Sequence, residues 1–321
     1  MADSVPPETV QRQIERALLG GDRKYNRIEV TEAAGVSLDR TRRLWMAMGF
    51  AEVGDDECVF TDGDVEALRI WGALVGTGLV AQADEASVAR ALSQPLSRLA
   101  DWQAQQVLAR SRDLDAGPDQ LAGLAKGLLP VIEGLQSYVW RRHLAAATGR
   151  ALSSAGDELS TRTSVVGFAD IVGYTTTTRH AGSDELSALL EAFEKDATET
   201  IATYRGRVVK TVGDEVLFVT DAAADAAEIA LRLADPARSD QGLPMLRVGM
   251  AMGPVLSRFG DVYGSVVNLA ARLTALARPG TVLVDKELAD ALRADYQLRA
   301  RRPVAVRGYH HLRSWSLRRA R

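Results

Sequence analysis

Three side chains with complementary chemistry lie within one short segment of this 321-residue chain. Asp261 precedes a glycine turn, and Asn268 and Arg272 follow in a segment whose periodicity predicts a helix. Residues four positions apart share one helix face, so the amide of Asn268 and the guanidinium of Arg272 should point the same way. A carboxylate, an amide and a guanidinium in this arrangement are the groups that would hold a nucleotide.

Two further segments supply carboxylates and a lysine. Asp170 ends a predicted strand that begins at residue 164, and Asp214 lies in a turn between two predicted strands, the first of which carries Lys210. If these strands are neighbours in a sheet, the two aspartates meet. Carboxylate oxygens are the ligands that divalent cations such as Mg²⁺ prefer, so the pair is a candidate metal site.

The second half of the chain alternates between strand and helix patterns and must position these groups. Strands are expected at 164–170, 207–211, 215–220, 246–252 and 281–284, with terminal strands from 296, and helices at 184–204, 222–234, 266–277 and 286–294. This order predicts an α+β domain with a mixed or antiparallel sheet under helical cover, and a ferredoxin-like βαββαβ core fits it. The pattern of the first half instead predicts helix almost throughout. We therefore expect an all-α domain over residues 1–156 and the α+β domain over 157–321.

The segments around Asp170, Asp214 and Asn268 together resemble the catalytic signature of class III nucleotidyl cyclases, whose catalytic domains use the βαββαβ core. The resemblance implies that two divalent ions, Mg²⁺ or Mn²⁺, bind to Asp170, Asp214 and the backbone carbonyl of Ile171. It also implies that the phosphates lie on the loop formed by Gly173, Tyr174 and Thr175. A basic residue of the last hairpin often contacts phosphates in this family, and Arg307, His310 and His311 are equivalent candidates here.

The same resemblance implies that Lys210 and Asp261 select the base. A lysine donates to adenine N1 and a carboxylate accepts from the exocyclic amine, whereas guanine presents the reverse polarity. Asn268 would orient the ribose, and Arg272 would stabilise the charge that develops on the phosphate. The resemblance thus implies an adenylyl cyclase that converts ATP to 3′,5′-cyclic AMP and pyrophosphate.

The family builds each site from two subunits, with the aspartates from one and the lysine, second aspartate, asparagine and arginine from the other. All these positions are filled in one chain, which implies a symmetric homodimer with two equivalent sites.

The N-terminal half is expected to regulate the catalytic half, with a coupling helix over about 119–155. Residues 25–68 are similar to the helix-turn-helix of MerR-type regulators, whose second helix would present Arg40, Arg42 and Arg43. A basic footprint is missing, since residues 1–150 carry 17 Lys and Arg against 21 Asp and Glu. We therefore expect a packing module rather than a nucleic-acid partner. The input could be a small molecule, a lipid or a proton, the last through His143.

Two other functions remain open from the sequence. An ATP-sensing MerR-like transcription regulator would keep the cyclase-like half without turnover, although a sensor has no use for Arg272. Diguanylate cyclases share only part of the turn around Asp214 and give Lys210 and Asp261 no role. The longest weakly polar run, residues 70–83, is too short for a membrane span, and no signal-peptide pattern opens the chain, so we expect a cytoplasmic protein.

Overall fold

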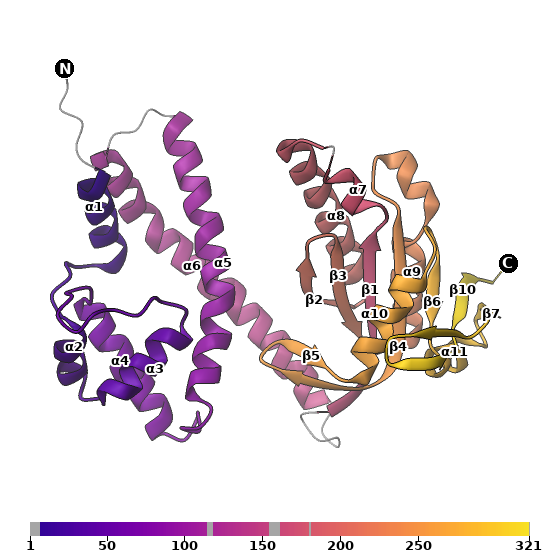
Figure 1. Ribbon diagram of the computed structural model, residues 1–321, viewed down its shortest axis with the longest axis horizontal. Coiled ribbons are helices and arrows are strands. Elements are labelled where there is room, and N and C mark those ends of the chain that lie inside the picture. The colour runs from indigo at the N-terminus through magenta and orange to yellow at the C-terminus, as the bar shows by residue number, and fades with distance from the viewer. Residues whose placement is uncertain (1–6, 114–117, 154–160, 180, 321) are drawn as a thin grey trace. The chain divides into compact units, whose positions relative to one another are not determined.

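The computed structural model describes residues 7–113, 118–153, 161–179 and 181–320. The chain divides into two compact units, Met1–Arg150 and Ala151–Arg321 (Figure 1). The predicted domain boundary between residues 156 and 157 lies outside the described residues. Within the described ranges, no helix is both long and apolar enough to cross a membrane.

The N-terminal unit is helical, as the sequence predicts. Its helices are α1 (Pro7–Leu19), α2 (Arg27–Ala34), α3 (Leu38–Ala47), α4 (Asp62–Gly76), α5 (Glu85–Asp113) and α6 (Pro118–Ser153), the last of which continues into the second unit. Extended pairing within the described part of this unit is limited to a single bridge between Tyr25 and Phe60.

Local capping sets the helix boundaries around α2 and α3. The Asn26 side chain accepts from the N–H groups of Ile28 and Glu29, and the Glu29 carboxylate accepts from the Asn26 N–H, which completes a capping box. Gly35 ends α2 in the left-handed region at φ 71°, where glycine has no Cβ penalty. Ser37 then caps α3, where its side chain accepts from the N–H of Arg40.

The second unit is an α+β domain built on one large sheet. Its elements are β1 (Thr161–Ile171), α7 (Tyr174–Thr177), α8 (Ser183–Thr203), β2 (Arg207–Val212), β3 (Glu215–Thr220), α9 (Ala223–Leu233), η1 (Pro236–Gln241), β4 (Leu246–Arg258), β5 (Asp261–Tyr263), α10 (Ser265–Leu276), β6 (Val282–Val284), α11 (Lys286–Leu292), β7 (Tyr296–Ala300), β8 (Val304–Val306), β9 (Tyr309–Leu312) and β10 (Trp315–Arg319). The strands follow the order β2-β3-β1-β4-β6-β10-β7, with β5 beside β4 and a separate β8–β9 hairpin. The first four strands in this order form the antiparallel βαββαβ core, which confirms the predicted fold.

The two faces of this sheet are covered differently. One face buries a core that includes Phe193 of α8, Ile229 of α9 and Leu288 of α11. The opposite face packs mainly against α10, through Val266, Ala270 and Leu273, with the β8–β9 hairpin at its edge. The helix that carries the predicted Asn268 and Arg272 therefore lies on the less covered face.

Strand β4 extends beyond the predicted end at residue 252. Gly253 and Pro254 normally interrupt strands, yet β4 continues to Arg258 because its second half pairs with the start of β1 on one side and with β5 on the other. The hairpin that results from this extension places Asp261 at the first position of β5.

Close packing of α10 on β4 depends on Gly249. A Cβ at this position would come within 2.0 Å of the backbone nitrogen of Thr274. Gly249→Ala is therefore expected to push α10 off the sheet and to lower the free energy of unfolding by about 1 to 3 kcal/mol, measured by urea denaturation. Gly253→Ala on the same strand is the matched control, because its Cβ would meet Val266 at an ordinary 3.6 Å. Equal stability of both variants would contradict the prediction.

Candidate active site

Two of the predicted metal ligands meet where β1 ends beside the β2–β3 turn. Asp170 is buried, and the N–H of the next residue, Ile171, donates to the backbone carbonyl of Asp214 at 3.0 Å. Burial raises the pKa of the Asp170 carboxyl, and the nearby Asp214 carboxyl raises it further. The positive charge and hydrogen bond of Arg247 partly offset this rise in pKa. The structure thus brings together the two aspartates that lie 44 positions apart in the sequence.

Two charged residues at this position were missed by the sequence analysis. Arg247 donates to the Asp170 carboxylate at 2.6 Å from the neighbouring strand β4. Glu215 pairs with Asp170 across β1 and β3, and its pKa is raised to about 7 by burial and by the charges of Asp170 and Asp214. Glu215 follows Asp214 directly and could have been considered from the sequence. Arg247 could not, because only the register of β4 against β1 places it there.

The donor set fits a hard divalent cation. It consists of two neighbouring carboxylates, Asp170 and Asp214, and the backbone carbonyl at Ile171. The described residues hold no cluster of three or more His, Cys, Asp or Glu side chains that could form an all-protein metal cage. Mg²⁺ is commonly held by one or two carboxylates with substrate phosphates supplying further oxygens, which matches this incomplete set.

The predicted base-selecting residues are in direct contact. Lys210 on β2 donates to the Asp261 carboxylate at 2.6 Å, although 51 positions separate the two residues. Burial opposes ionisation of Asp261, but the hydrogen bonds from Lys210 and from the Val262 N–H hold its pKa below the ordinary value. Both side chains are partly exposed, at 43% and 29%, so a ligand can reach them.

Asn268 and Arg272 lie one turn apart on α10, and both are exposed. Their common face follows from the helix that the sequence predicts. Neither side chain forms a hydrogen bond or ion pair with a described residue of the Asp170 or Lys210 groups, so the structure leaves them directed at solvent beside the sheet.

The predicted phosphate loop follows β1 directly. Gly173 adopts φ 78° and precedes the short helix α7, which begins at Tyr174 and includes Thr175. The left-handed conformation explains why glycine occupies this position. The hairpin turn at Arg307 is also present, and Arg307, His310 and His311 all lie on this hairpin, so the structure does not distinguish these three candidates.

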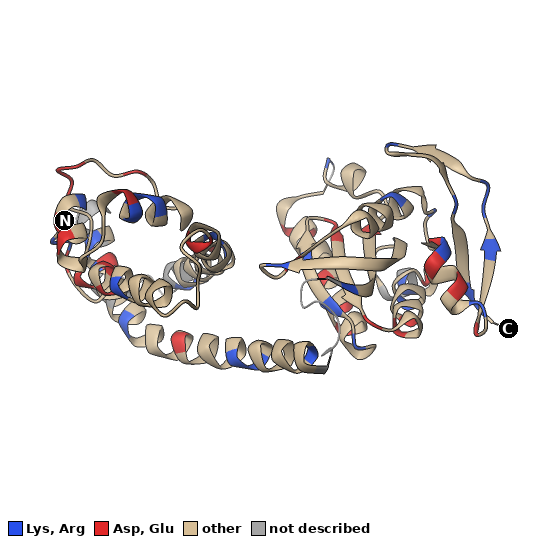
Figure 2. Ribbon diagram, turned by 90° about the horizontal axis from the view of Figure 1, so that it is seen from below, with Lys and Arg blue, Asp and Glu red and all other residues tan. Residues whose placement is uncertain are grey.

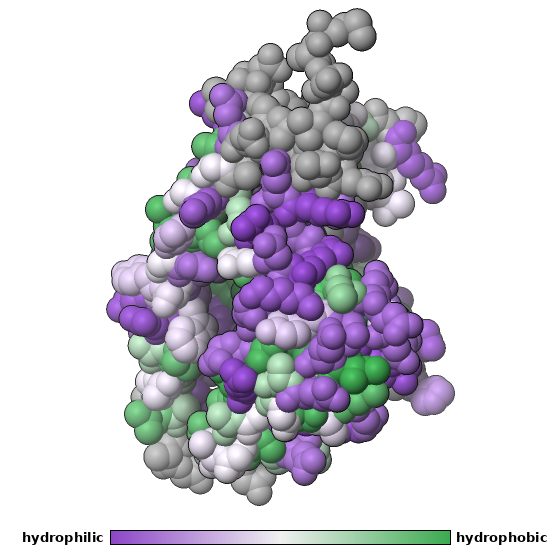
Figure 3. Space-filling model, turned by 90° about the vertical axis from the view of Figure 1, so that its left-hand side faces the viewer, coloured by the Kyte–Doolittle hydropathy of each residue, from purple (hydrophilic) through white to green (hydrophobic). Residues whose placement is uncertain are grey.

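The arginines of the helix-turn-helix-like segment are all neutralised locally. Arg40 pairs with Glu85, Arg42 with Glu52 and Arg43 with Asp39. Figure 2 shows Lys and Arg interspersed with Asp and Glu on the helices of the N-terminal unit. The surface of this unit seen in Figure 3 is largely hydrophilic with scattered hydrophobic residues. These features do not favour a groove-binding surface for DNA.

Comparison with known proteins agrees with the geometry of the second unit. Residues 159–319 match the family described as the adenylate and guanylate cyclase catalytic domain. An adenylate cyclase of Streptomyces coelicolor is 41% identical over 90% of this chain and 78% of its own length. An adenylate cyclase of Streptomyces griseus is 43% identical over 87% of this chain and 71% of its own length. Among solved structures, the adenylyl cyclase CyaB from P. aeruginosa aligns with 50% of this chain and 96% of its own, at 21% identity and a TM-score of 0.45. On the family match and the two Streptomyces relatives, the chain belongs to the adenylate and guanylate cyclase family of enzymes.

Proposed function

We propose that this protein is an adenylate cyclase that converts ATP to 3′,5′-cyclic AMP and pyrophosphate. The observation that carries the choice of ATP is the contact between Lys210 and Asp261. It presents a hydrogen-bond donor and an acceptor side by side, which matches N1 and the exocyclic amine of adenine. Guanine would place a donor against the lysine and an acceptor against the carboxylate.

The remaining site residues have distinct roles in this reaction. Asp170, Asp214 and the Ile171 carbonyl would hold divalent ions, which assist deprotonation of the ribose 3′-hydroxyl and neutralise phosphate charge. The Asn268 amide orients the ribose. The Arg272 guanidinium donates to the phosphate oxygens as negative charge builds on them in the transition state. The N–H groups that follow Gly173 receive the phosphate chain.

We further infer that the enzyme acts as a homodimer with shared sites. In one chain the Asp170–Asp214 pair and the Lys210–Asp261 pair share no hydrogen bond or ion pair among the described residues. Large apolar side chains near the second pair are exposed, namely Val212 (63%), Leu256 (39%), Phe259 (49%) and Tyr263 (50%). A second chain that covers these side chains would remove apolar surface from water and complete both sites.

The direct test is cyclic AMP formation by the purified full-length chain. With ATP and Mn²⁺ or Mg²⁺, wild type is expected to form cyclic AMP and pyrophosphate in equal amounts. The Asp170→Ala variant should form neither. Formation of neither product by wild type at several pH values would count against the proposal.

Asp261→Asn is expected to weaken discrimination between ATP and GTP. The asparagine amide keeps an acceptor oxygen but adds an N–H donor that can face guanine. The substitution also removes the negative charge that pairs with Lys210. We expect the ratio of kcat/KM for ATP to that for GTP to fall about tenfold, the effect of one hydrogen bond to a charged group. Asp290→Asn on α11 is a matched surface control. An unchanged ratio would show that Asp261 does not contribute to base selection.

We also propose that the N-terminal unit regulates the cyclase and that a proton is one input. His143 lies exposed on α6, beside Arg141 and Arg142, in the helix that joins the two units. Histidine is in general the side chain that changes charge near neutral pH, which motivates a proton as the input. The pH–activity profiles of full-length wild type and His143→Ala test this role, and identical profiles would leave a small molecule or a lipid as the input.

A further inference from the structure

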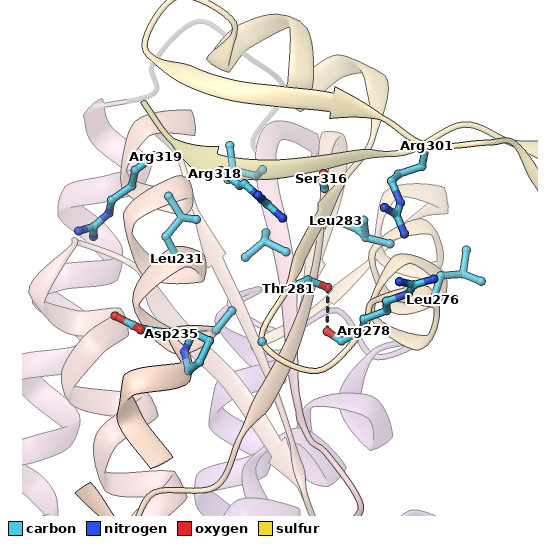
Figure 4. Close-up of a pocket in the computed structure, with 15 residues that line it drawn as sticks. Leu231, Asp235, Leu276, Arg278, Thr281, Leu283, Arg301, Ser316, Arg318 and Arg319 are labelled. Carbon is cyan, nitrogen blue, oxygen red and sulfur yellow. Dashed lines mark hydrogen bonds between the residues drawn. The ribbon is translucent and has the colours of Figure 1, made fainter. Parts of the chain in front are cut away.

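A cavity in the second unit lies apart from every residue assigned above. It has a volume of about 420 Å³ and lies between the ends of α9 and α10, the start of β6 and the end of β10. Figure 4 shows its walls, with the β10 side above and the turn that precedes β6 below. The volume falls within the range of small-molecule sites, roughly 300 to 1,000 Å³.

Three arginine side chains with no partner reach this cavity. Arg278 follows α10, Arg301 follows β7 and Arg318 lies on β10, and no described residue forms an ion pair or hydrogen bond with their guanidinium groups. Arg278 and Arg301 extend toward each other from opposite walls, and Arg318 points into the space below β10 (Figure 4). Like charges around one cavity repel one another unless an anion lies among them.

The other charged groups of the lining are already engaged. Arg319 points away from the cavity and donates to Glu228 at 2.8 Å. The Asp235 carboxylate accepts from the N–H of Ala237 at 3.0 Å. Besides the Arg319–Glu228 pair, the lining therefore contains three guanidinium groups and one carboxylate, which gives the cavity a net positive charge.

The cavity also touches buried apolar side chains from both faces of the sheet. Val282, Leu283 and Leu317 line it, with exposures of 2%, 5% and 3%. Leu283 pairs with Ser316 across β6 and β10, so it lies on the same face of the sheet as Ser316 and Arg318. An apolar group attached to an anion among the arginines would therefore lie against Leu283. Guanidinium groups bind phosphate through paired N–H donors, and three of them match a phosphate dianion better than a single carboxylate.

We propose that this cavity binds a small organic phosphate, with the phosphate between Arg278, Arg301 and Arg318 and an apolar group against Leu283. The site is separate from the proposed ATP site and does not depend on its assignment.

Isothermal titration of the full-length chain with phenyl phosphate tests the proposal. Wild type is expected to bind one equivalent, more tightly than it binds inorganic phosphate or phenol. Arg301→Gln and Arg318→Gln should each weaken binding about tenfold or more, the effect of losing hydrogen bonds to a charged group. Arg302→Gln is the matched control, since this exposed neighbour of Arg301 does not line the cavity.

Thermal unfolding without ligand establishes that each variant is folded. Equal binding by wild type, Arg301→Gln and Arg318→Gln would overturn the site, because the phosphate would then lie elsewhere, such as at the ATP site. Equal affinity of wild type for phenyl phosphate and inorganic phosphate would overturn the apolar contact with Leu283. The Asp170→Ala variant should bind phenyl phosphate as wild type does, which keeps this test independent of catalysis.

Discussion

Equal mixing of purified Asp170→Ala and Lys210→Ala chains is expected to restore cyclic AMP formation that neither variant shows alone. In the proposed homodimer, each variant has the same defect in both of its sites. A mixed dimer combines the intact Lys210–Asp261 pair of one chain with the intact Asp170–Asp214 pair of the other. Random exchange gives mixed dimers as half of the population, each with one working site of two, so the mixture should reach about a quarter of wild-type activity.

A second mixture controls for this result. Asp170→Ala and Asp214→Ala remove two ligands of the same half-site, so their mixed dimers contain no intact site and should stay inactive. Recovery in both mixtures would contradict the shared-site arrangement. Absence of recovery in the first mixture, while wild type is active and exchanges subunits, would place each complete site within one chain.

Arg272→Ala is expected to lower kcat by about 10² to 10³ while leaving KM for ATP nearly unchanged. Arg272 is exposed on α10 and has no partner among the described residues, so its removal leaves no buried charge unpaired. Its contribution is therefore expected in the transition state, where the phosphate oxygens gain charge, and not in substrate binding. Steady-state kinetics with ATP separates the two parameters.

Two further variants sharpen this measurement. Arg272→Lys keeps the positive charge but loses the planar pair of N–H donors, so it should recover only part of kcat. Arg293→Ala removes another exposed arginine, directly after α11, whose ion pair with Asp290 lies on the surface, and it should behave as wild type. A large rise in KM with unchanged kcat in Arg272→Ala would assign the guanidinium to ground-state binding instead.

Local sequence patterns were sufficient for most elements of the second unit. The predicted helix 184–204 corresponds to α8 (Ser183–Thr203), and the strand 215–220 corresponds to β3. Apolar residues with a period of two or 3.6 report which face of an element is buried, and this information is local. The extension of β4 to Arg258 was missed because tertiary pairing with β1 and β5 overrode the Gly253-Pro254 signal.

The placement of the candidate site residues could be predicted in part for the same reason. The spacing of Asn268 and Arg272 reports a common helix face, and the structure places both on the exposed side of α10. The pairing of Lys210 with Asp261 was expected only through the family resemblance. No local pattern connects a residue of β2 with one of β5.

The sequence by itself determined the order of the elements, the α+β class and the set of side chains available for nucleotide chemistry. Only the tertiary structure decided which of these side chains meet, because contacts between distant segments depend on strand order and register. The antiparallel pairing of β1 with β4 places Arg247 against Asp170, and the pairing of β1 with β3 places Glu215 there too. The arginine-lined cavity has the same origin, since Arg278, Arg301 and Arg318 come from separate segments that the pairing of β10 with β6 and β7 brings together.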